Sequence, residues 1–165
     1  MAANDGQTEG AGQAAPQNLG VLAQYVKDLS FENPGAPQSL RARNAPPQIN
    51  VSINVSTGTP VANEVEVELK IEAEAKSDGK PLFTVELTYG GMFRLTNIPP
   101  EATRPFLMTE CPGPLFPSAR RVLAAATRNG GFPPLLLDPV DFVSLYRQRA
   151  AEQAPPPMFR PDQLA

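Results

Sequence analysis

The side chains that could do covalent chemistry are few in this chain. Cys111 is the single cysteine and there is no histidine, so a cysteine nucleophile would lack the base that usually activates it. We interpret Cys111, in an apolar stretch before Pro112, as a packed thiol; a cysteine-dependent hydrolase is the alternative from a different class. Gly90 and Gly91 resemble part of a phosphate loop, but no lysine or hydroxyl follows at the required spacing. We therefore expect no enzyme activity, cofactor or metal site.

A run of acidic residues at alternate positions offers a different chemistry, the recognition of a basic partner by charge. Residues 64–74 read EVEVELKIEAE, which puts five glutamates and Lys70 on one side of a strand and apolar residues on the other. Residues 48–56 (QINVSINVS) and 82–89 (LFTVELTY) alternate in the same way. One face of an antiparallel sheet is therefore predicted to be buried and the other acidic. Such a face suits docking on another protein; alternatively, the carboxylates only keep an exposed sheet soluble.

Two further strand features complete the predicted sheet. A first strand is expected near residues 21–32, with Tyr25, Leu29 and Phe31 pointing inward and Asp28, Ser30 and Glu32 pointing outward. The segment KSDGKP at 76–81 predicts a hairpin between the third and fourth strands. Gly90 and Gly91 then permit a bulge, a bend or a close backbone approach at the end of the fourth strand.

Helical signals follow from residue 99 onward. We predict helices at 101–110 and 117–128, and a third that starts at Asp138, with Asp138 as its N-cap and Pro139 in its first turn. Phe142, Leu145, Tyr146 and Arg149 then fall along one side of this helix. The loop GGFPPLLLD before it is apolar and, if exposed, would make a sticky surface. The fold class is α+β: a four-stranded antiparallel sheet with helices packed on one face.

Composition narrows the classes of partner and location. The 165 residues carry a net charge of −3, which gives no reason to expect nucleic acid or an anionic membrane as partner. We find neither a signal peptide nor an apolar run long enough to span a bilayer, so we expect a cytoplasmic protein without direct membrane insertion. We assign residues 20–153 to one domain and residues 1–19 and 154–165 to flexible tails.

Four segments in this order resemble motifs of SecB, the bacterial protein-export chaperone: KDLSFENP, LTYGGMF, ECPGPLFPSAR and GGFPPLLLDPVDFVSLYRQ. The resemblance covers about residues 21–148. It implies a homotetramer, built as a dimer of dimers, that holds unfolded precursor proteins without ATP and delivers them to the translocation motor SecA. The chain departs from the family pattern at Asn44-Ala45-Pro46, where many members carry a tryptophan.

The resemblance also assigns candidate site residues. Asp28, Glu32 and Glu86 match acidic positions that contact SecA in the family, while Thr84 stands where an apolar contact residue is usual. The candidates for a client-binding groove are apolar or aromatic residues of the loop and the last helix: Phe132, Leu135, Leu137, Phe142 and Tyr146. Each of these five is equally well interpreted as a core residue. The runner-up function is a SecB-like chaperone dedicated to one client, such as an antitoxin; the three retained acids argue against it.

Overall fold

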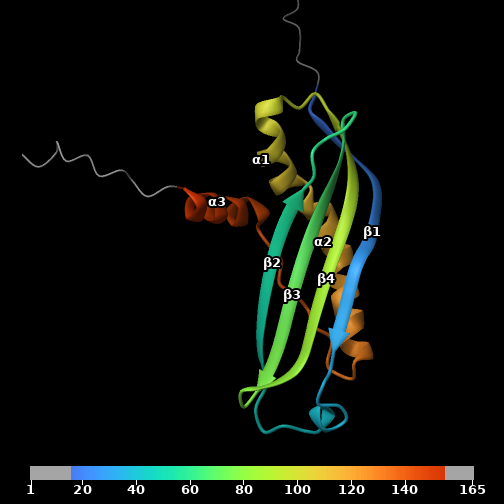
Figure 1. Cartoon of the computed structure of the whole chain (residues 1–165), viewed down its shortest axis with the longest axis vertical. Coiled ribbons are helices and arrows are strands. Elements are labelled where there is room, and N and C mark those ends of the chain that lie inside the picture. The colour runs from blue at the N-terminus through green and yellow to red at the C-terminus, as the bar shows by residue number, and fades with distance from the viewer. Residues whose placement is uncertain (1–15, 155–165) are drawn as a thin grey trace, which may run out of the picture.

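The computed structural model describes residues 16–154 and contains one antiparallel sheet with helices on one side (Figure 1). The sheet has the strand order β1-β4-β3-β2, so β1 and β2 are its edges. The elements are β1 (Asn18–Glu32), the 3₁₀ helix η1 (Gln38–Leu40), β2 (Gln48–Thr57), β3 (Glu64–Ser77), β4 (Lys80–Thr96), α1 (Pro100–Glu110), α2 (Pro112–Asn129) and α3 (Phe142–Gln153). The predicted α+β fold and four-stranded sheet are confirmed.

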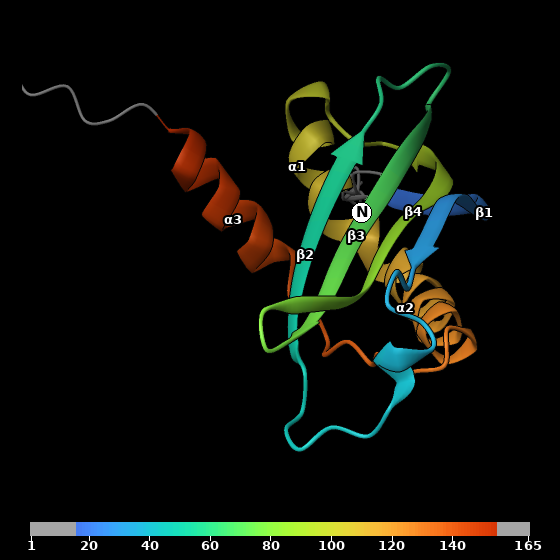
Figure 2. The same cartoon turned by 60° about the horizontal axis from the view of Figure 1, so that its bottom comes forward.

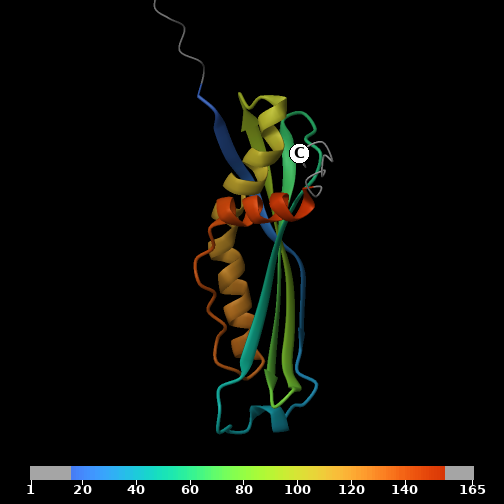
Figure 3. The ribbon, with the colours of Figure 1, turned by 90° about the vertical axis from the view of Figure 1, so that its left-hand side faces the viewer.

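The helices cover one face of the sheet and leave the other open. α1 and α2 lie behind the sheet, while α3 projects sideways from it (Figures 1 and 3). The apolar side chains of β3 and β4 that face α2 are almost fully buried, and the alternate side chains on the outer face remain partly exposed. The largest of these buried side chains belongs to Phe93 on β4. The alternation in the sequence therefore sets which side of the sheet is core.

The first strand departs from simple alternation at two points. The register of β1 against β4 shifts between Val21 and Ala23 and again between Val26 and Asp28, so two residues of β1 bulge out of the pairing. Each extra residue turns the following side chains to the opposite face. The prediction that Tyr25 points inward is therefore wrong: it lies opposite Gly90 and faces outward.

The glycine pair does not end β4. The strand continues to Thr96, and Gly90 pairs with β1 on one side and β3 on the other. A Cβ on Gly90 would lie 2.6 Å from the Tyr25 ring on the outer face, and one on Gly91 would lie 2.6 Å from Leu115 of α2 on the inner face. The predicted close approach is confirmed, although it occurs within the strand and not at its end.

The hairpin between β3 and β4 forms as predicted. Its two-residue turn consists of Asp78 and Gly79, both with positive φ, which matches the right-handed twist of the strands that it joins. At the lower end of the molecule, the loop that carries η1 approaches the end of α2 (Figure 2), where the Asn33 amide donates to the Gly130 carbonyl at 3.4 Å. The sheet is thus tied to the helical layer at this end.

Two predicted helix starts are corrected by their capping residues. α2 begins at Pro112 and not at residue 117, because proline is favourable at the first helical position; only Cys111 separates it from α1. α3 begins at Phe142, four residues after the predicted start. Its N-cap is Asp141, whose carboxylate accepts the Ser144 backbone N–H at 3.1 Å and the Ser144 hydroxyl at 2.9 Å.

The predicted tails lie mostly outside the described residues. β1 begins at Asn18, within the segment 1–19 predicted as a tail, and residues 1–15 are not described. Of the predicted C-terminal tail, 154–165, only Ala154 is described. No helix in the described part of the chain combines the length and the apolar character that crossing a bilayer requires.

Candidate functional site

The outer face of the sheet carries the predicted acidic wall, but the five glutamates of β3 share four cations, which offset most of their charge. All five outward glutamates of β3 have a cationic partner on the same face. The pairs are Glu64 with Arg94 (2.7 Å), Glu66 with Lys27 (2.8 Å), Glu68 also with Lys27, Glu72 with Lys70 (3.1 Å) and Glu74 with Lys76 (3.6 Å). This part of the wall therefore presents less net negative charge than its sequence indicates.

The three acids that match the docking positions differ from the β3 glutamates. Asp28, Glu32 and Glu86 form no ion pair with any of residues 16–154. Asp28 lies opposite Thr88 and Glu32 opposite Thr84, which puts Glu86 diagonally between them on β4. Diagonal neighbours on one face have Cα atoms about 7–8 Å apart. The structure therefore brings the three carboxylates together as one cluster, which we name the acidic docking site.

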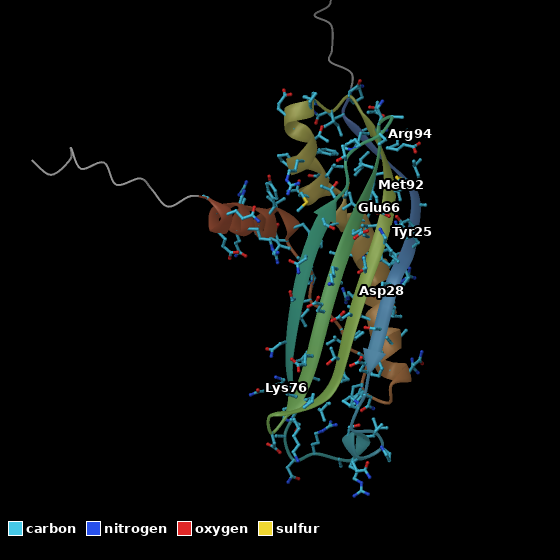
Figure 4. The ribbon with its side chains drawn as sticks, in the orientation of Figure 1. Tyr25, Asp28, Glu66, Lys76, Met92 and Arg94 are labelled. Carbon is cyan, nitrogen blue, oxygen red and sulfur yellow. The ribbon has the colours of Figure 1, made fainter. Side chains whose placement is uncertain are left out.

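A polar network that the sequence did not reveal lies directly above this site. The Tyr25 hydroxyl donates to the Glu66 carboxylate, and Lys27 Nζ donates to both Glu66 and Glu68. Burial and the adjacent Glu66 raise the pKa of Tyr25 to about 12, while the bonds from Lys27 and Tyr25 lower the pKa of Glu66. Figure 4 shows Tyr25 and Glu66 close together on the outer face and Asp28 below them. The sequence feature that could have indicated this network is Gly90, since a glycine inside a strand often marks a place where another group passes close to the backbone.

On the inner face, the first groove candidate is part of an aromatic cluster. Phe132 packs against Phe83 with ring centroids 4.8 Å apart and against Phe31 at 6.4 Å. The Arg43 guanidinium lies over the Phe132 ring, 5.9 Å from its centroid. Arg43 also donates to the Ser39 carbonyl, so the loop that carries η1 covers the cluster. Phe132 is consequently buried within the single chain.

The loop between α2 and α3 is only partly the exposed apolar surface that its sequence predicts. Leu135 and Leu137 are buried, whereas Leu136 between them is 67% exposed. The Leu135 backbone N–H donates to the Thr127 hydroxyl at 2.9 Å, and this hydroxyl in turn bonds the Leu123 carbonyl at 3.0 Å. The fully buried Thr127 therefore fastens the loop to α2 and fixes which leucines face the core.

The remaining groove candidates lie where α3 meets α1 and β2. Phe142 is buried, whereas Tyr146 is half-buried, and both line a cavity of about 170 Å³ with apolar residues and two arginines. Arg149 bonds the Ile53 carbonyl at 2.9 Å and the Asn54 side chain, which holds α3 against the edge of β2. The predicted side of the helix thus faces the cavity, whose further lining residues are Val55, Arg104, Met108, Leu145, Ala150 and Gln153.

The five groove candidates do not form one site, because Phe132 lies in the aromatic cluster, Phe142 and Tyr146 line the cavity, and Leu135 and Leu137 belong to the loop. Phe132 belongs to the aromatic cluster and Tyr146 to the cavity, at opposite ends of the α2–α3 loop. Four of the five are buried in the isolated chain, which favours their interpretation as core residues there. Tyr146 alone keeps an accessible side chain. Their contact with clients stays a prediction.

Both edges of the sheet expose apolar side chains that the helices do not cover. On β1, Val21, Val26 and Leu29 are between 43 and 45% exposed, and on β2 the values for Ile49 and Val51 are 44 and 42%. All five lie on the helix-covered side by their pairing with inward residues. One chain therefore presents more apolar sheet surface than its own helices cover.

The chemistry of Cys111 fits a packed thiol. The side chain is fully buried between α1 and α2, and burial, with a smaller effect of the Glu110 charge, raises the pKa of the thiol to about 12. At neutral pH the residue is therefore a thiol and a poor nucleophile. The described residues contain no cluster of three or more histidine, cysteine, aspartate or glutamate side chains suited to a metal ion.

Comparison with a family model and with curated relatives gives one family. The family model "Preprotein translocase subunit SecB" matches residues 12–153. A protein-export protein SecB from Bradyrhizobium sp. (strain BTAi1) is 57% identical over 141 residues, which are 86% of this chain and 87% of the relative. The SecB of Rhodopseudomonas palustris (strain HaA2) is 56% identical over 146 residues, covering 87% of this chain and 92% of the relative.

A solved structure extends the comparison to the fold. The SecB-like chaperone of Mycobacterium tuberculosis, in complex with a peptide from an antitoxin, superposes with a TM-score of 0.62 at 12% identity, covering 74% of this chain and 90% of that one. At this identity the likeness concerns the fold alone. The matched family model and the high identity over most of both chains establish that the chain belongs to the SecB family of protein-export chaperones.

Proposed function

We propose that this chaperone is a cytoplasmic, ATP-independent holdase that binds unfolded precursor proteins, keeps them competent for translocation and delivers them to SecA. It acts as a homotetramer, a dimer of dimers, and uses two surfaces. The acidic docking site of Asp28, Glu32 and Glu86 contacts SecA, and apolar surface on the helical side of the sheet contacts the client. No chemical step and no cofactor are involved.

The observation that carries the proposal is the contrast between paired and unpaired acids on one face. The β3 glutamates are each in a salt bridge, whereas Asp28, Glu32 and Glu86 are close together and form no salt bridge with any of residues 16–154. Lys70, which pairs with Glu72, acts on Asp28 and Glu86 only through its charge at longer range. Neighbouring like charges repel one another, so a basic partner relieves this repulsion on docking. Charges at the rim of an interface mainly speed encounter and set register, which suits a fast, salt-sensitive handover.

Client binding is expected to need many weak contacts. Burying one large apolar side chain yields about 1.5–3 kcal/mol, whereas association costs on the order of 4–15 kcal/mol, so several contacts must act together. The accessible Tyr146 and the exposed Ile49 and Val51 support contacts on the helical side. We keep Phe132, Leu135, Leu137 and Phe142 as further client contacts, although they are buried in the single chain. Repetition around a tetramer raises the effective concentration of each later contact without any client motif.

Exposed apolar residues along β1 support assembly. Val21, Val26 and Leu29 are nearly half exposed although they lie on the inner face of the sheet. A second copy placed along this edge would cover them and would also provide hydrogen-bond partners for the backbone N–H and C=O groups at the open edge of β1.

The proposed function is tested by two assays on the same variant. Asp28→Lys with Glu86→Lys should weaken SecA binding strongly, while suppression of the aggregation of an unfolded precursor stays at the parental level. The parental association rate with SecA should fall as salt rises. Parental SecA binding by the double variant would refute the docking role, and failure of the parent to retard precursor aggregation would refute the holdase role.

A further inference from the structure

Part of β1 is turned over relative to the rest of the strand. Tyr25 lies on the outer face, because its hydroxyl bonds Glu66 there. Strict alternation from Tyr25 would point Asp28 and Glu32 into the helix-covered face. The bulge at Lys27 adds one residue to β1, and from there onward the even-numbered residues face outward. Given that Tyr25 faces outward, Asp28 and Glu32 join Glu86 on the outer face only because of the bulge at Lys27.

The contacts that hold the bulge reach across the sheet. Lys27 Nζ donates to Glu66 at 2.8 Å and also to Glu68, both on β3, which is separated from β1 by β4. The Tyr25 hydroxyl donates to the same Glu66. The Tyr25 side chain crosses β4 at Gly90, where a Cβ would lie 2.6 Å from the Tyr25 ring. These bonds fasten the bulged segment to β3, and Gly90 leaves the space that the Tyr25 ring needs to reach Glu66. Figure 4 shows Tyr25 and Glu66 next to each other on the outer face.

We propose that Tyr25 and Lys27 are positioning residues for SecA docking: by holding the β1 bulge against Glu66, they keep Asp28 and Glu32 projecting from the outer face beside Glu86. The inference rests on the proposed function, since it assumes that these three acids contact SecA. It extends the set of residues that SecA docking requires beyond the three acids, to a tyrosine and a lysine.

Charge alone predicts the opposite effect of a Lys27 substitution. If the outer face attracted a basic partner only by its net charge, removal of the Lys27 ammonium would make the face more acidic and strengthen SecA binding. If Lys27 holds the bulge, its removal lets β1 lose the register that presents Asp28, and SecA binding weakens. The sign of the change therefore separates the two explanations.

The chain offers a matched control for this test. Lys70 lies on the same face and pairs with Glu72 of its own strand at 3.1 Å, in a part of β3 that is in regular register with β4. Both lysines are nearly half exposed, so neither substitution should threaten folding. Lys27→Met and Lys70→Met then remove the same charge from the same face, but only Lys27→Met removes a bulge contact.

SecA binding would be measured by titration at low salt for the parent, Lys27→Met, Lys70→Met and Lys27→Arg. We expect Lys27→Met to weaken binding on the order of fivefold, Lys70→Met to leave it unchanged or tighter, and Lys27→Arg to keep the parental value. Binding by Lys27→Met that is as tight as that of Lys70→Met would overturn the proposal.

Two further measurements separate this proposal from the proposed function. Gly90→Ala changes no charge but should displace the Tyr25 ring and weaken SecA binding, whereas Gly113→Ala, at a helical site with open space around it, should not. Cross-strand NMR contacts between Asp28 and Thr88 report the register without SecA and should weaken in Lys27→Met. If those contacts persist unchanged, the positioning role is refuted whether or not SecA binds; if they weaken while Asp28→Lys binds SecA normally, the docking role fails instead.

Discussion

Phe142 lies edge-on against Phe116, with ring centroids 5.8 Å apart and ring planes at 75°. The contact joins the first turn of α3 to α2, and Phe142 is buried there, while Tyr146 one turn later remains accessible beside the cavity. Two aromatic residues on one side of a helix thus have different surroundings. Their substitutions should have different consequences.

We predict that Phe142→Ala destabilises the fold and that Tyr146→Leu reduces client capture. Truncation of a buried phenylalanine costs about 3–5 kcal/mol of folding free energy, so Phe142→Ala should melt at a clearly lower temperature. Tyr146→Leu should keep the parental melting temperature and lose part of its ability to suppress precursor aggregation. Parental values in both assays for Tyr146→Leu would remove this residue from the client surface.

Thr127→Val should destabilise the chain by about 1–3 kcal/mol, because it leaves the buried Leu135 N–H without an acceptor. Thr109→Val is the matched control, since the Thr109 hydroxyl also bonds a backbone carbonyl one turn earlier but at an exposed site. Denaturant unfolding of both variants checks the prediction. Equal losses would mean that the link between Leu135 and Thr127 contributes nothing specific.

Sedimentation should show the parent at about four chain masses at micromolar concentration. Val26→Asp should shift it toward smaller species, because Val26 is 45% exposed on the β1 edge in the single chain. Val61→Asp, at a 74% exposed position in the turn before β3, should not change the assembly. A parent that sediments as a stable monomer would contradict the proposed tetramer.

The stability that Asp141 contributes as N-cap of α3 should depend on pH. Bonds from Ser144 lower the pKa of Asp141 in the folded state, so the ionised carboxylate stabilises the fold above its unfolded pKa of about 3.9. That contribution is lost as the pH falls through the lowered folded-state pKa. The melting temperature of Asp141→Ala should therefore lie below that of the parent at pH 7, and the gap should shrink below about pH 4.

Asp138→Ala is the control for this capping assignment. Asp138 was the predicted N-cap from sequence, yet it lies in the loop four residues before the first helical residue. The difference in melting temperature between Asp138→Ala and the parent should not depend on pH in the acid range. A pH-dependent gap for Asp138→Ala and none for Asp141→Ala would reverse the assignment.

Cys111 should react with thiol reagents only slowly in the native protein, even at pH 9. Its pKa of about 12 leaves little thiolate at that pH, and the side chain is fully buried. Reaction should become fast in denaturant, because unfolding exposes the thiol and removes the cause of its raised pKa. Rapid labelling of the native chain at neutral pH would reopen the hydrolase alternative.

Most of the sheet could be predicted from the sequence because its signals are local. Period-two alternation identified the buried faces of β3 and β4, and Asp78-Gly79 supplied the turn between them. The outward positions of Asp28, Glu32 and Glu86 also followed from parity. The outward orientation of Tyr25 did not follow from parity, because the contacts of Tyr25 and Lys27 involve Glu66 and Gly90, which are distant in sequence.

Charge balance and burial at the candidate sites could be predicted less well. The glutamates of β3 read as one uniform acidic wall, although their neutralisation depends on partners such as Lys27 and Arg94 that reach them from other strands. Similarly, the sequence left open whether Phe132 is a groove residue or a core residue, because the Arg43 that covers its ring belongs to a loop distant in sequence. Pairwise contacts over long sequence separations were the missing information in both cases.

The central position of β4 in the sheet has a thermodynamic consequence. Glu86 belongs to the acidic docking site, while its neighbours Val85 and Leu87 belong to the core beneath the helices. Because β4 contributes side chains to both faces, as β1 does with Asp28 and Leu29, it offers one route by which a bound client would influence the affinity for SecA. Linkage then requires reciprocity: the factor by which an occupied helical side changes SecA affinity is also the factor by which bound SecA changes client affinity. The effect of a bound client on SecA affinity and the effect of bound SecA on client release would thus be set by the same coupling free energy.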